Sequence, residues 1–401
     1  MRGHRGPRRG SELNELSIIP DGSLLINDGV IEEVGPSRRV ENLAAARGAV
    51  EISAAGRVVM PGLVDAHTHL LFPPPGPVGP DDESAARAVR ASTGQRMQAR
   101  AHALLDAMAR HGTTTVEIKT GCGPDESAET KLLRVMAALK GKPLDIVPTF
   151  LFRLPQPDLT GEAGVEAAAD WVFRELLPKI RRRRFACFAD LAWDPNPEHH
   201  DCYECYLRLA RSMGFACKIH ADRAGASRAI AMAVQHLAVS VDHLEQATPE
   251  DAALMAGSGT MVTLLPCASF RSGEIAAPAR ALIDGGVAVA LGTNFNSHHT
   301  PMLNMQTVIA LASMRLGMTA AEAVTAATIN GAHALGCANR VGSLEVGKSA
   351  DLLILNISDY RDLADHFGCN LVHLTMKRGE FIYQEGEVAP RPAEDLSLTW
   401  Q

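Results

Sequence analysis

Four histidines in this chain are spaced so that their side chains could meet at one metal ion. His67 and His69 are separated by a single threonine, and His220 and His243 each lie at the end of an apolar run. Side chains at positions i and i+2 of an extended strand lie on the same face, so His67 and His69 would point the same way. Imidazole nitrogens are common ligands of zinc and other divalent transition metals. The spacing therefore favours a metal centre, with packed core histidines as the alternative.

These histidines belong to apolar runs of strand length, which recur along the middle of the chain. The runs occupy residues 62–70, 113–121, 144–152, 185–194, 216–222, 238–246, 259–267 and 288–296. Most are continuously apolar, which is typical of parallel strands that are buried on both faces. Helix-like segments lie between them, and two of these, 100–112 and 128–141, end at a glycine, as helices often do.

Eight strands that alternate with helices predict an α/β fold of the (β/α)₈ TIM-barrel type. In such barrels the catalytic groups lie at the C-terminal ends of the strands, where the four histidines are expected. An open, doubly wound sheet is the competing arrangement, but no glycine-rich phosphate loop supports it.

The two ends of the chain have a different pattern, with short strand-like runs separated by glycine turns. Residues 20–60 contain PDGSLLINDGVIEEVG, and residues 342–388 contain GSLEVGKSADLLIL and VHLTMKRGEFIYQEGEV. Short runs joined in this way are typical of β-hairpins. We therefore expect a small β domain formed by residues 1–61 and 338–401, beside a barrel formed by residues 62–337.

The composition argues against several classes of protein. The 401 residues are 46% hydrophobic, too apolar for a disordered chain, and the net charge of −7 argues against nucleic acid as the main partner. No segment offers the roughly 18 uncharged apolar residues that a membrane span needs. The 8 cysteines are scattered rather than arranged as a disulfide framework, which indicates a reducing cytoplasm.

Two cysteine motifs have alternative interpretations. The run HHDCYEC places Cys202 and Cys205 beside His199 and His200, which superficially fits a second zinc site. No second cysteine pair accompanies it, so ordinary helix and loop residues are the favoured interpretation. Cys122 could be a nucleophile, but the sequence offers no base to assign to it.

Several long runs are specific enough to indicate a family. They read MPGLVDAHTHLLF, GTTTVEIKTGCGPDESAETKLLRV, KIHAD, VDHLE, TLLPCASF, TNFN, TINGAHALG and RVGSLEVGKSADLLIL. The chain resembles the amidohydrolase superfamily and, within it, the imidazolonepropionase family, whose members open the ring lactam of imidazolone propionate in histidine degradation. The resemblance covers nearly the whole chain. It implies a distorted (β/α)₈ barrel with a β-sandwich from both termini, and one zinc or iron ion held by His67, His69 and His220.

The resemblance also implies roles for three residues near the metal. His243 would stabilise the developing oxyanion or position the water, and Asn296 would contact the substrate ring. The family has an aspartate at the end of the eighth strand, as a metal ligand and base, and this chain has Asn294 there. A carboxamide can ligate weakly through oxygen but cannot act as a base near neutral pH. Loss of a general base typically costs about 10²–10⁴-fold in rate.

Other positions in the expected substrate pocket depart from the family pattern. Arg223 stands where the family has glutamate or glutamine, Cys122 replaces a tyrosine, and Arg153 belongs to an FRLP run that replaces a histidine turn. At the barrel mouth Arg153 and Arg223 would bind a substrate carboxylate, with surface arginines as the alternative. His298 and His299 follow the eighth strand and could supply the missing base, with exposed loop histidines as the alternative.

These features predict a cytoplasmic, metal-dependent hydrolase of cyclic amide or amidine C–N bonds. Its substrate would be a small nitrogen heterocycle, and the arginines favour an anionic one. The alternative is a catalytically impaired homologue that binds a ligand or serves a structural role, because Asn294 replaces the catalytic aspartate. The resemblance implies a homodimer, and neither nucleic acid nor a membrane is expected as a partner.

Overall fold

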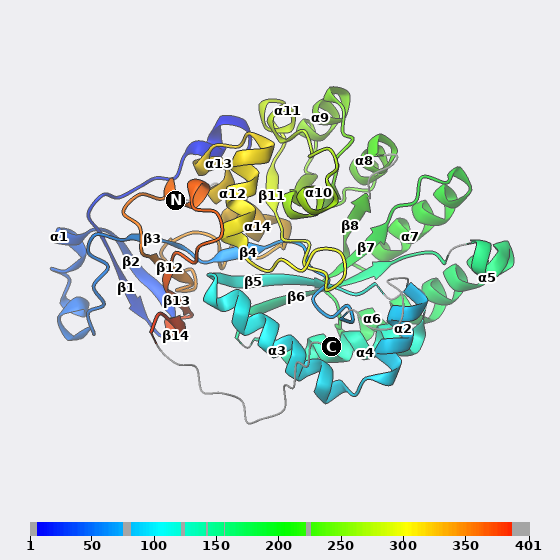
Figure 1. The fold of residues 1–401 in the computed structure, drawn as a ribbon, viewed down its shortest axis with the longest axis horizontal. Helices are drawn as coiled ribbons and strands as arrows, with labels where there is room; N and C mark the ends of the chain where they lie inside the picture. Colours follow the sequence, from blue (N-terminus) through cyan, green and yellow to red (C-terminus); the bar gives the residue numbers. More distant parts are fainter. Residues whose placement is uncertain are drawn as a thin grey trace.

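A sheet of eight parallel strands forms the centre of the computed structural model, which describes residues 6–74, 82–121, 125–141, 143–155, 157–221 and 226–386 (Figure 1). The strands are β4 (Leu63–Asp65), β5 (Thr113–Lys119), β6 (Asp145–Phe152), β7 (Phe188–Ala192), β8 (Ala216–Ala221), β9 (Ser240–His243), β10 (Met261–Leu264) and β11 (Val289–Leu291). They neighbour one another in chain order. This order confirms the predicted barrel and excludes a doubly wound sheet, in which the strand order reverses.

The barrel approaches closure between the segments that follow its first and last strands. The backbone N–H of His69 donates to the carbonyl of Phe295 at 2.8 Å. Gly292 permits this approach, because a Cβ atom at that position would lie 2.9 Å from the Cβ of His67. The end of the eighth strand is therefore held directly beside the histidine pair.

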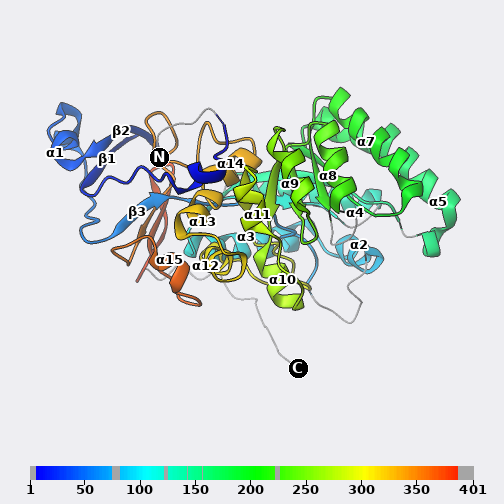
Figure 2. The same ribbon diagram turned by 90° about the horizontal axis from the view of Figure 1, so that it is seen from above.

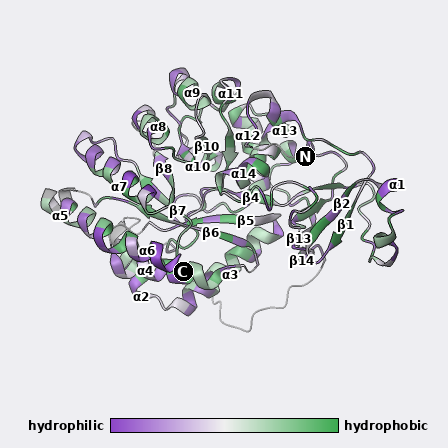
Figure 3. Ribbon diagram, turned by 180° about the vertical axis from the view of Figure 1, so that it is seen from behind, coloured by the Kyte–Doolittle hydropathy of each residue, from purple (hydrophilic) through white to green (hydrophobic). Residues whose placement is uncertain are grey.

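Helices surround the strands. They include α2 (Asp82–Ala91), α3 (Gly94–Arg110), α4 (Glu126–Leu139), α5 (Pro157–Trp171), α6 (Leu177–Arg183), α7 (His200–Ser212), α8 (Ala226–Gln235), α9 (Pro249–Ala256), α10 (Pro266–Ser272), α11 (Ala279–Asp284), α12 (Met305–Leu316), α13 (Ala320–Ala326) and α14 (Ile329–Ala334). The two helices predicted from the sequence are α3 and α4, and positive φ angles at Gly112 and Gly141 follow them. In Figure 3 the strands β5 and β6 are largely hydrophobic, whereas the surrounding helices carry both colours.

None of the helices in the parts of the chain that the structure describes combines the length and the apolar character that a membrane span requires.

Both ends of the chain form antiparallel sheets at one end of the molecule (Figures 1 and 2). The strands β1 (Gly22–Asn27) and β2 (Val30–Pro36) form a hairpin, and its turn residues Asp28 and Gly29 have φ angles of 49° and 77°, as a type I′ turn requires. A second sheet has the order β14 (Glu380–Gln384), β13 (Val372–Lys377), β12 (Leu352–Leu355) and β3 (Val58–Pro61). The pairing of β3 with β12 confirms that the two termini build this β-rich part together.

Polar contacts join the β-rich part and the N-terminal segment to the barrel. Lys377 in β13 forms an ion pair of 2.8 Å with Asp145, the first residue of β6. The backbone N–H of Arg8 donates to the side-chain carbonyl of Asn330 in α14 at 2.8 Å. The first described residues thus pack against a barrel helix, although they belong to the expected β domain. The domain boundaries at 61/62 and 337/338 stay a prediction.

Candidate metal centre

Four histidines converge at the C-terminal edge of the barrel strands. His220 lies in β8 and His243 ends β9, whereas His67 and His69 lie just beyond β4 rather than within it. The Nε2 atoms of His67 and His69 are 3.3 Å apart, and the ring centroids of His220 and His243 are 4.7 Å apart. Ring nitrogens of His67, His220 and His243 all lie within 4.8 Å of one another. His243, to which the resemblance gave a catalytic role, is thus part of the same cluster.

Burial favours the neutral form of the imidazoles of His67, His69 and His220. It lowers the pKa of His67 and of His220 well below the ordinary value, and it lowers the pKa of His69 to about 3. The nearby Lys119 ammonium group lowers the pKa of all three further. Neutral imidazole is the form that binds metals. In the described part of the chain the buried Nδ1 of His220 has no hydrogen-bond partner, so the cluster fits a divalent transition metal.

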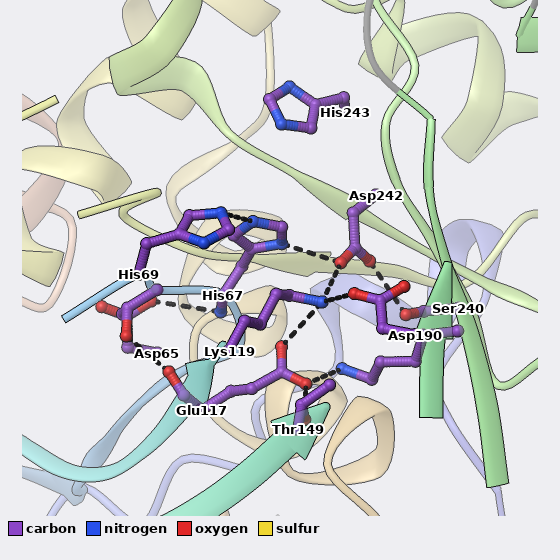
Figure 4. A network of polar contacts seen from close by, with 12 residues as sticks. Asp65, His67, His69, Glu117, Lys119, Thr149, Asp190, Ser240, Asp242 and His243 are labelled. Atoms are coloured by element: carbon purple, nitrogen blue, oxygen red, sulfur yellow. Dashed lines mark hydrogen bonds and ion pairs between the residues drawn. The ribbon is translucent and has the colours of Figure 1, made fainter. Parts of the chain in front are cut away.

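Asp242 orients the ring of His67. The Nδ1 atom of His67 lies 2.7 Å from Oδ2 of Asp242, and both side chains are fully buried (Figure 4). Because a carboxylate accepts hydrogen bonds, Nδ1 carries the proton and Nε2 keeps its lone pair. The hydroxyl of Ser240 donates to the other oxygen of Asp242 at 2.9 Å. Asp242 therefore selects the nitrogen that His67 can offer to a metal.

A layer of charged side chains lies beside Asp242 in the barrel interior. Lys119, the last residue of β5, forms an ion pair with Asp190, and its Nζ lies 2.9 Å from Asp242 and 3.4 Å from Glu117 (Figure 4). Lys218 forms a further ion pair with Glu117 at 2.8 Å. All five side chains are fully buried. Three carboxylates and two ammonium groups leave one net negative charge, so most of the buried charge is compensated, as burial requires.

Asn294 lies beside the cluster but not in a strand, because β11 ends three residues earlier at Leu291. Its backbone N–H donates to the carbonyl of His67 at 3.0 Å, and its φ angle is 54°. The carboxylate of Asp65 accepts hydrogen bonds from the backbone N–H and the hydroxyl of Thr293, at 2.9 Å and 2.6 Å. Position 294, where the resemblance implies a metal ligand, is thus held beside His67 by a backbone hydrogen bond.

The end of β9 has a strained backbone. His243 and Leu244 have φ angles of 79° and 66°, a region that residues other than glycine rarely adopt and that is often found at functional sites. The Nδ1 atom of His243 lies 3.2 Å from Oε1 of Glu245, and both side chains are buried. With Nδ1–H donated to that carboxylate, the lone pair of the ring lies on Nε2.

Two of the predicted substrate-binding residues can be placed. Arg153 follows β6 directly and is half-buried, and its charge also contributes to the lowered pKa of His69, after burial and Lys119. Asn296 also shapes the turn after β11, because its Oδ1 accepts the backbone N–H groups of His298 and His299 at 2.9 Å and 3.3 Å, and its contact with the substrate stays a prediction. The other two, Cys122 and Arg223, lie outside the described residues.

The remaining histidine motifs have other partners in their described contacts. The ring of His298 packs edge-on against Phe72, with centroids 5.5 Å apart. Cys202 and Cys205 lie in α7, and His200 stacks on Trp193 with ring centroids 4.9 Å apart. Among the described residues, no group with metal-binding geometry occurs in this segment.

Sequence reasoning missed Asp242 and Asp190 and gave Lys119 and Glu117 no role. A signal was present, because each lies inside an apolar run that was predicted to be buried: TTTVEIKTG, FACFADLAWD and AVSVDHLEQ. Charged residues are almost never fully buried unless they are paired. Charges in such strands therefore indicate a network inside the barrel.

Comparisons with known proteins agree with this architecture. The model of the amidohydrolase family matches residues 198–382. The imidazolonepropionase of Brevibacillus brevis is 36% identical over 410 residues, which cover 96% of each chain, and that of Parabacteroides distasonis is 36% identical over 395 residues, which cover 93% of this chain and 94% of the relative.

Solved structures with the same fold have lower sequence identity. The N-isopropylammelide isopropylaminohydrolase of Burkholderia multivorans has a TM-score of 0.72 and 19% identity, covering 96% of this chain and 98% of that one. A zinc-bound adenosine deaminase of Xanthomonas campestris has a TM-score of 0.67 and 21% identity, covering 93% and 90%. At such identities the likeness establishes the barrel fold alone.

Proposed function

The chain belongs to the amidohydrolase superfamily, among the relatives of the imidazolonepropionases, and from this premise we propose that it hydrolyses a cyclic amide or amidine C–N bond. Its substrate is a small nitrogen heterocycle, imidazolone propionate or a related ring that is opened in the same way. The observation that carries the proposal is the buried four-histidine cluster at the C-terminal edge of the barrel, where barrels of this kind hold their catalytic groups.

The cluster would hold one divalent ion, zinc or iron, through His67, His69 and His220, with the amide oxygen of Asn294 as a weak fourth ligand. When bound, such an ion polarises the scissile carbonyl and lowers the pKa of a water molecule. Asp242 supports this arrangement because its Oδ2 lies 2.7 Å from Nδ1 of His67 and keeps the proton on that nitrogen. The atom that can bind a metal is then Nε2.

In this proposal His243 moves the proton. Glu245 accepts the Nδ1–H of His243 at 3.2 Å, so Nε2 is the nitrogen that can take a proton from the attacking water. The same nitrogen can deliver that proton to the ring nitrogen as the C–N bond breaks. The carboxamide of Asn294 cannot share this work, because it is not basic near neutral pH.

Arg153 is the reason for proposing a negatively charged substrate. The residue lies at the C-terminal end of β6, and its positive charge acts on His69. A guanidinium group binds a carboxylate through two parallel hydrogen bonds. A heterocycle with a carboxylate side chain could therefore be oriented by Arg153 while its ring lies at the histidine cluster.

A second candidate is a catalytically impaired homologue that binds a heterocycle without turning it over. Asn294 is the observation that favours it, because the position beside His67 lacks the carboxylate that the family resemblance implies. The two candidates share the same histidine cluster and differ in turnover alone.

Turnover of the metal-loaded protein separates the two candidates. Imidazolone propionate and a panel of anionic and neutral lactams and cyclic amidines are assayed with the wild type and with His67→Ala. Ring opening by the wild type that His67→Ala abolishes supports the hydrolase. Saturable binding of a heterocycle with no ring opening of any compound contradicts it and supports the impaired homologue. The homodimer and the cytoplasmic location stay predictions from the sequence.

A further inference from the structure

We infer that Lys119 is a positioning residue that holds the Asp242 carboxylate against His67 and thereby sets the donor atom of the first histidine. The inference rests on the proposed metal centre. Lys119 is fully buried, and its Nζ lies 2.9 Å from Oδ2 of Asp242. That same oxygen lies 2.7 Å from Nδ1 of His67. One carboxylate oxygen is thus shared between the ammonium group and the imidazole (Figure 4).

The ammonium group also contacts two further carboxylates. Lys119 forms an ion pair with Asp190 and lies 3.4 Å from Glu117. Asp190 also accepts the backbone N–H of Leu191 at 2.9 Å. Lys119 therefore joins β5, β7 and β9, and the position of Asp242 follows from contacts on three strands.

The backbone of Lys119 reaches the histidine pair by a second route. Its N–H donates to the carbonyl of Thr68 at 2.9 Å, and Thr68 is the residue between His67 and His69. The same residue thus fixes the backbone of the pair and, through Asp242, the ring of His67. Outer partners of this kind determine the ring orientation of metal-binding histidines.

Lys218 provides a matched control within the same barrel interior. It is equally buried and carries the same charge, but its described ion pair is to Glu117 at 2.8 Å. Its ammonium group also lies over the ring of Phe188, 4.9 Å from the centroid. Replacement of Lys218 removes a buried charge, as replacement of Lys119 does, but leaves the contact between Lys119 and Asp242 in place.

The experiment measures zinc affinity by chelator competition for the wild type, Lys119→Met, Lys218→Met and Asp190→Asn, and the stability of each metal-free protein by urea unfolding. Lys119→Met should lose about 10–100-fold in zinc affinity, the usual cost of removing an outer-shell partner. Lys218→Met should lose stability but less than about 3-fold in affinity. Asp190→Asn keeps the charge of Lys119 and should lower the affinity by an intermediate factor, which gives a result even if Lys119→Met does not fold.

Nuclear magnetic resonance of metal-free protein with ¹⁵N-labelled histidine supplies a readout that a merely structural role would not change. The wild type should show His67 as the Nδ1–H tautomer, and Asp190→Asn should shift that signal. Unchanged zinc affinity in Lys119→Met and Asp190→Asn, or an equal loss in Lys218→Met, would overturn this inference alone. A wild type that binds no zinc overturns the proposed metal centre together with it.

Discussion

The backbone N–H of Asn294 donates to the backbone carbonyl of His67 at 3.0 Å, so the residue that follows the eighth strand is fixed beside the first histidine of the cluster. The φ angle of 54° at Asn294 and the contacts between Asp65 and Thr293 hold this arrangement. A carboxylate introduced at position 294 would therefore appear next to the proposed metal centre without a change in the backbone.

Replacement of Asn294 by aspartate should raise the rate of ring opening. A carboxylate at this position adds a second base beside His243, so the gain should be smaller than the roughly 10²–10⁴-fold that a first general base supplies. The measurement is kcat on the best substrate of the panel. Asn304→Asp is the matched control, because Asn304 caps α12 and aspartate caps helices equally well. A rate for Asn294→Asp no higher than that of the wild type would contradict this prediction.

Replacement of Arg153 by methionine should weaken the binding of acidic substrates selectively. Loss of charge-assisted hydrogen bonds costs about 1.5–3 kcal/mol each, so KM for a carboxylate-bearing heterocycle should rise about 10-fold or more. KM for a neutral analogue should stay unchanged. The control is Arg182→Met, whose side chain is exposed in α6, and its KM values for the acidic and the neutral substrate should both equal those of the wild type. Equal effects on acidic and neutral substrates would argue against a recognition role.

Replacement of Gly292 by alanine should destabilise the barrel where it closes. The added Cβ would lie 2.9 Å from the backbone nitrogen and Cβ of His67, and overpacking of this kind costs about 1–3 kcal/mol. Gly259→Ala is the control, because a Cβ at Gly259 meets no atom within 4 Å. Chemical denaturation of both variants measures the difference. Equal free energies of unfolding for the two variants would show that this approach is not tightly packed.

The stability of the protein should depend on pH through His333. Burial, together with the charge of Lys348, lowers the pKa of His333 from 6.5 to about 4. Between these values the unfolded chain binds the proton and the folded chain does not, so His333 favours folding above pH 6.5 and loses this contribution as the pH falls toward 4.

The test compares the free energies of unfolding of the wild type and His333→Gln at pH 7 and pH 5. The advantage of the wild type over the variant should shrink at pH 5. An advantage that is constant or grows on acidification would contradict the lowered pKa.

The sequence predicts the barrel well because each strand is a local apolar run, and the helices α3 and α4 are each followed by a glycine. It also predicts the N-terminal hairpin of β1 and β2, since the Asp28-Gly29 turn is a local signal. Strand ends are less certain: His67 and His69 lie beyond β4, and Asn294 lies beyond β11. These ends depend on where the barrel closes, which involves residues far apart in the chain.

The charged interior is the part of the site that the sequence does not reveal. Lys119 and Asp190 are 71 residues apart, and no local pattern states that they pair. Asn296 illustrates a second limit, because the sequence does not show that its Oδ1 accepts the backbone N–H groups of His298 and His299. The partners of a polar side chain follow from the tertiary structure rather than from its position in a motif.

The most direct test of the account is the metal content of the purified protein after supplementation with zinc or iron. The wild type and the control His366→Ala, whose histidine is exposed, should each hold one ion per chain. His67→Ala and His220→Ala should lose the ion or bind it far more weakly while remaining folded. A wild type without metal, or a His67→Ala variant that binds it as tightly as the wild type, would contradict the metal centre on which the proposed hydrolysis depends.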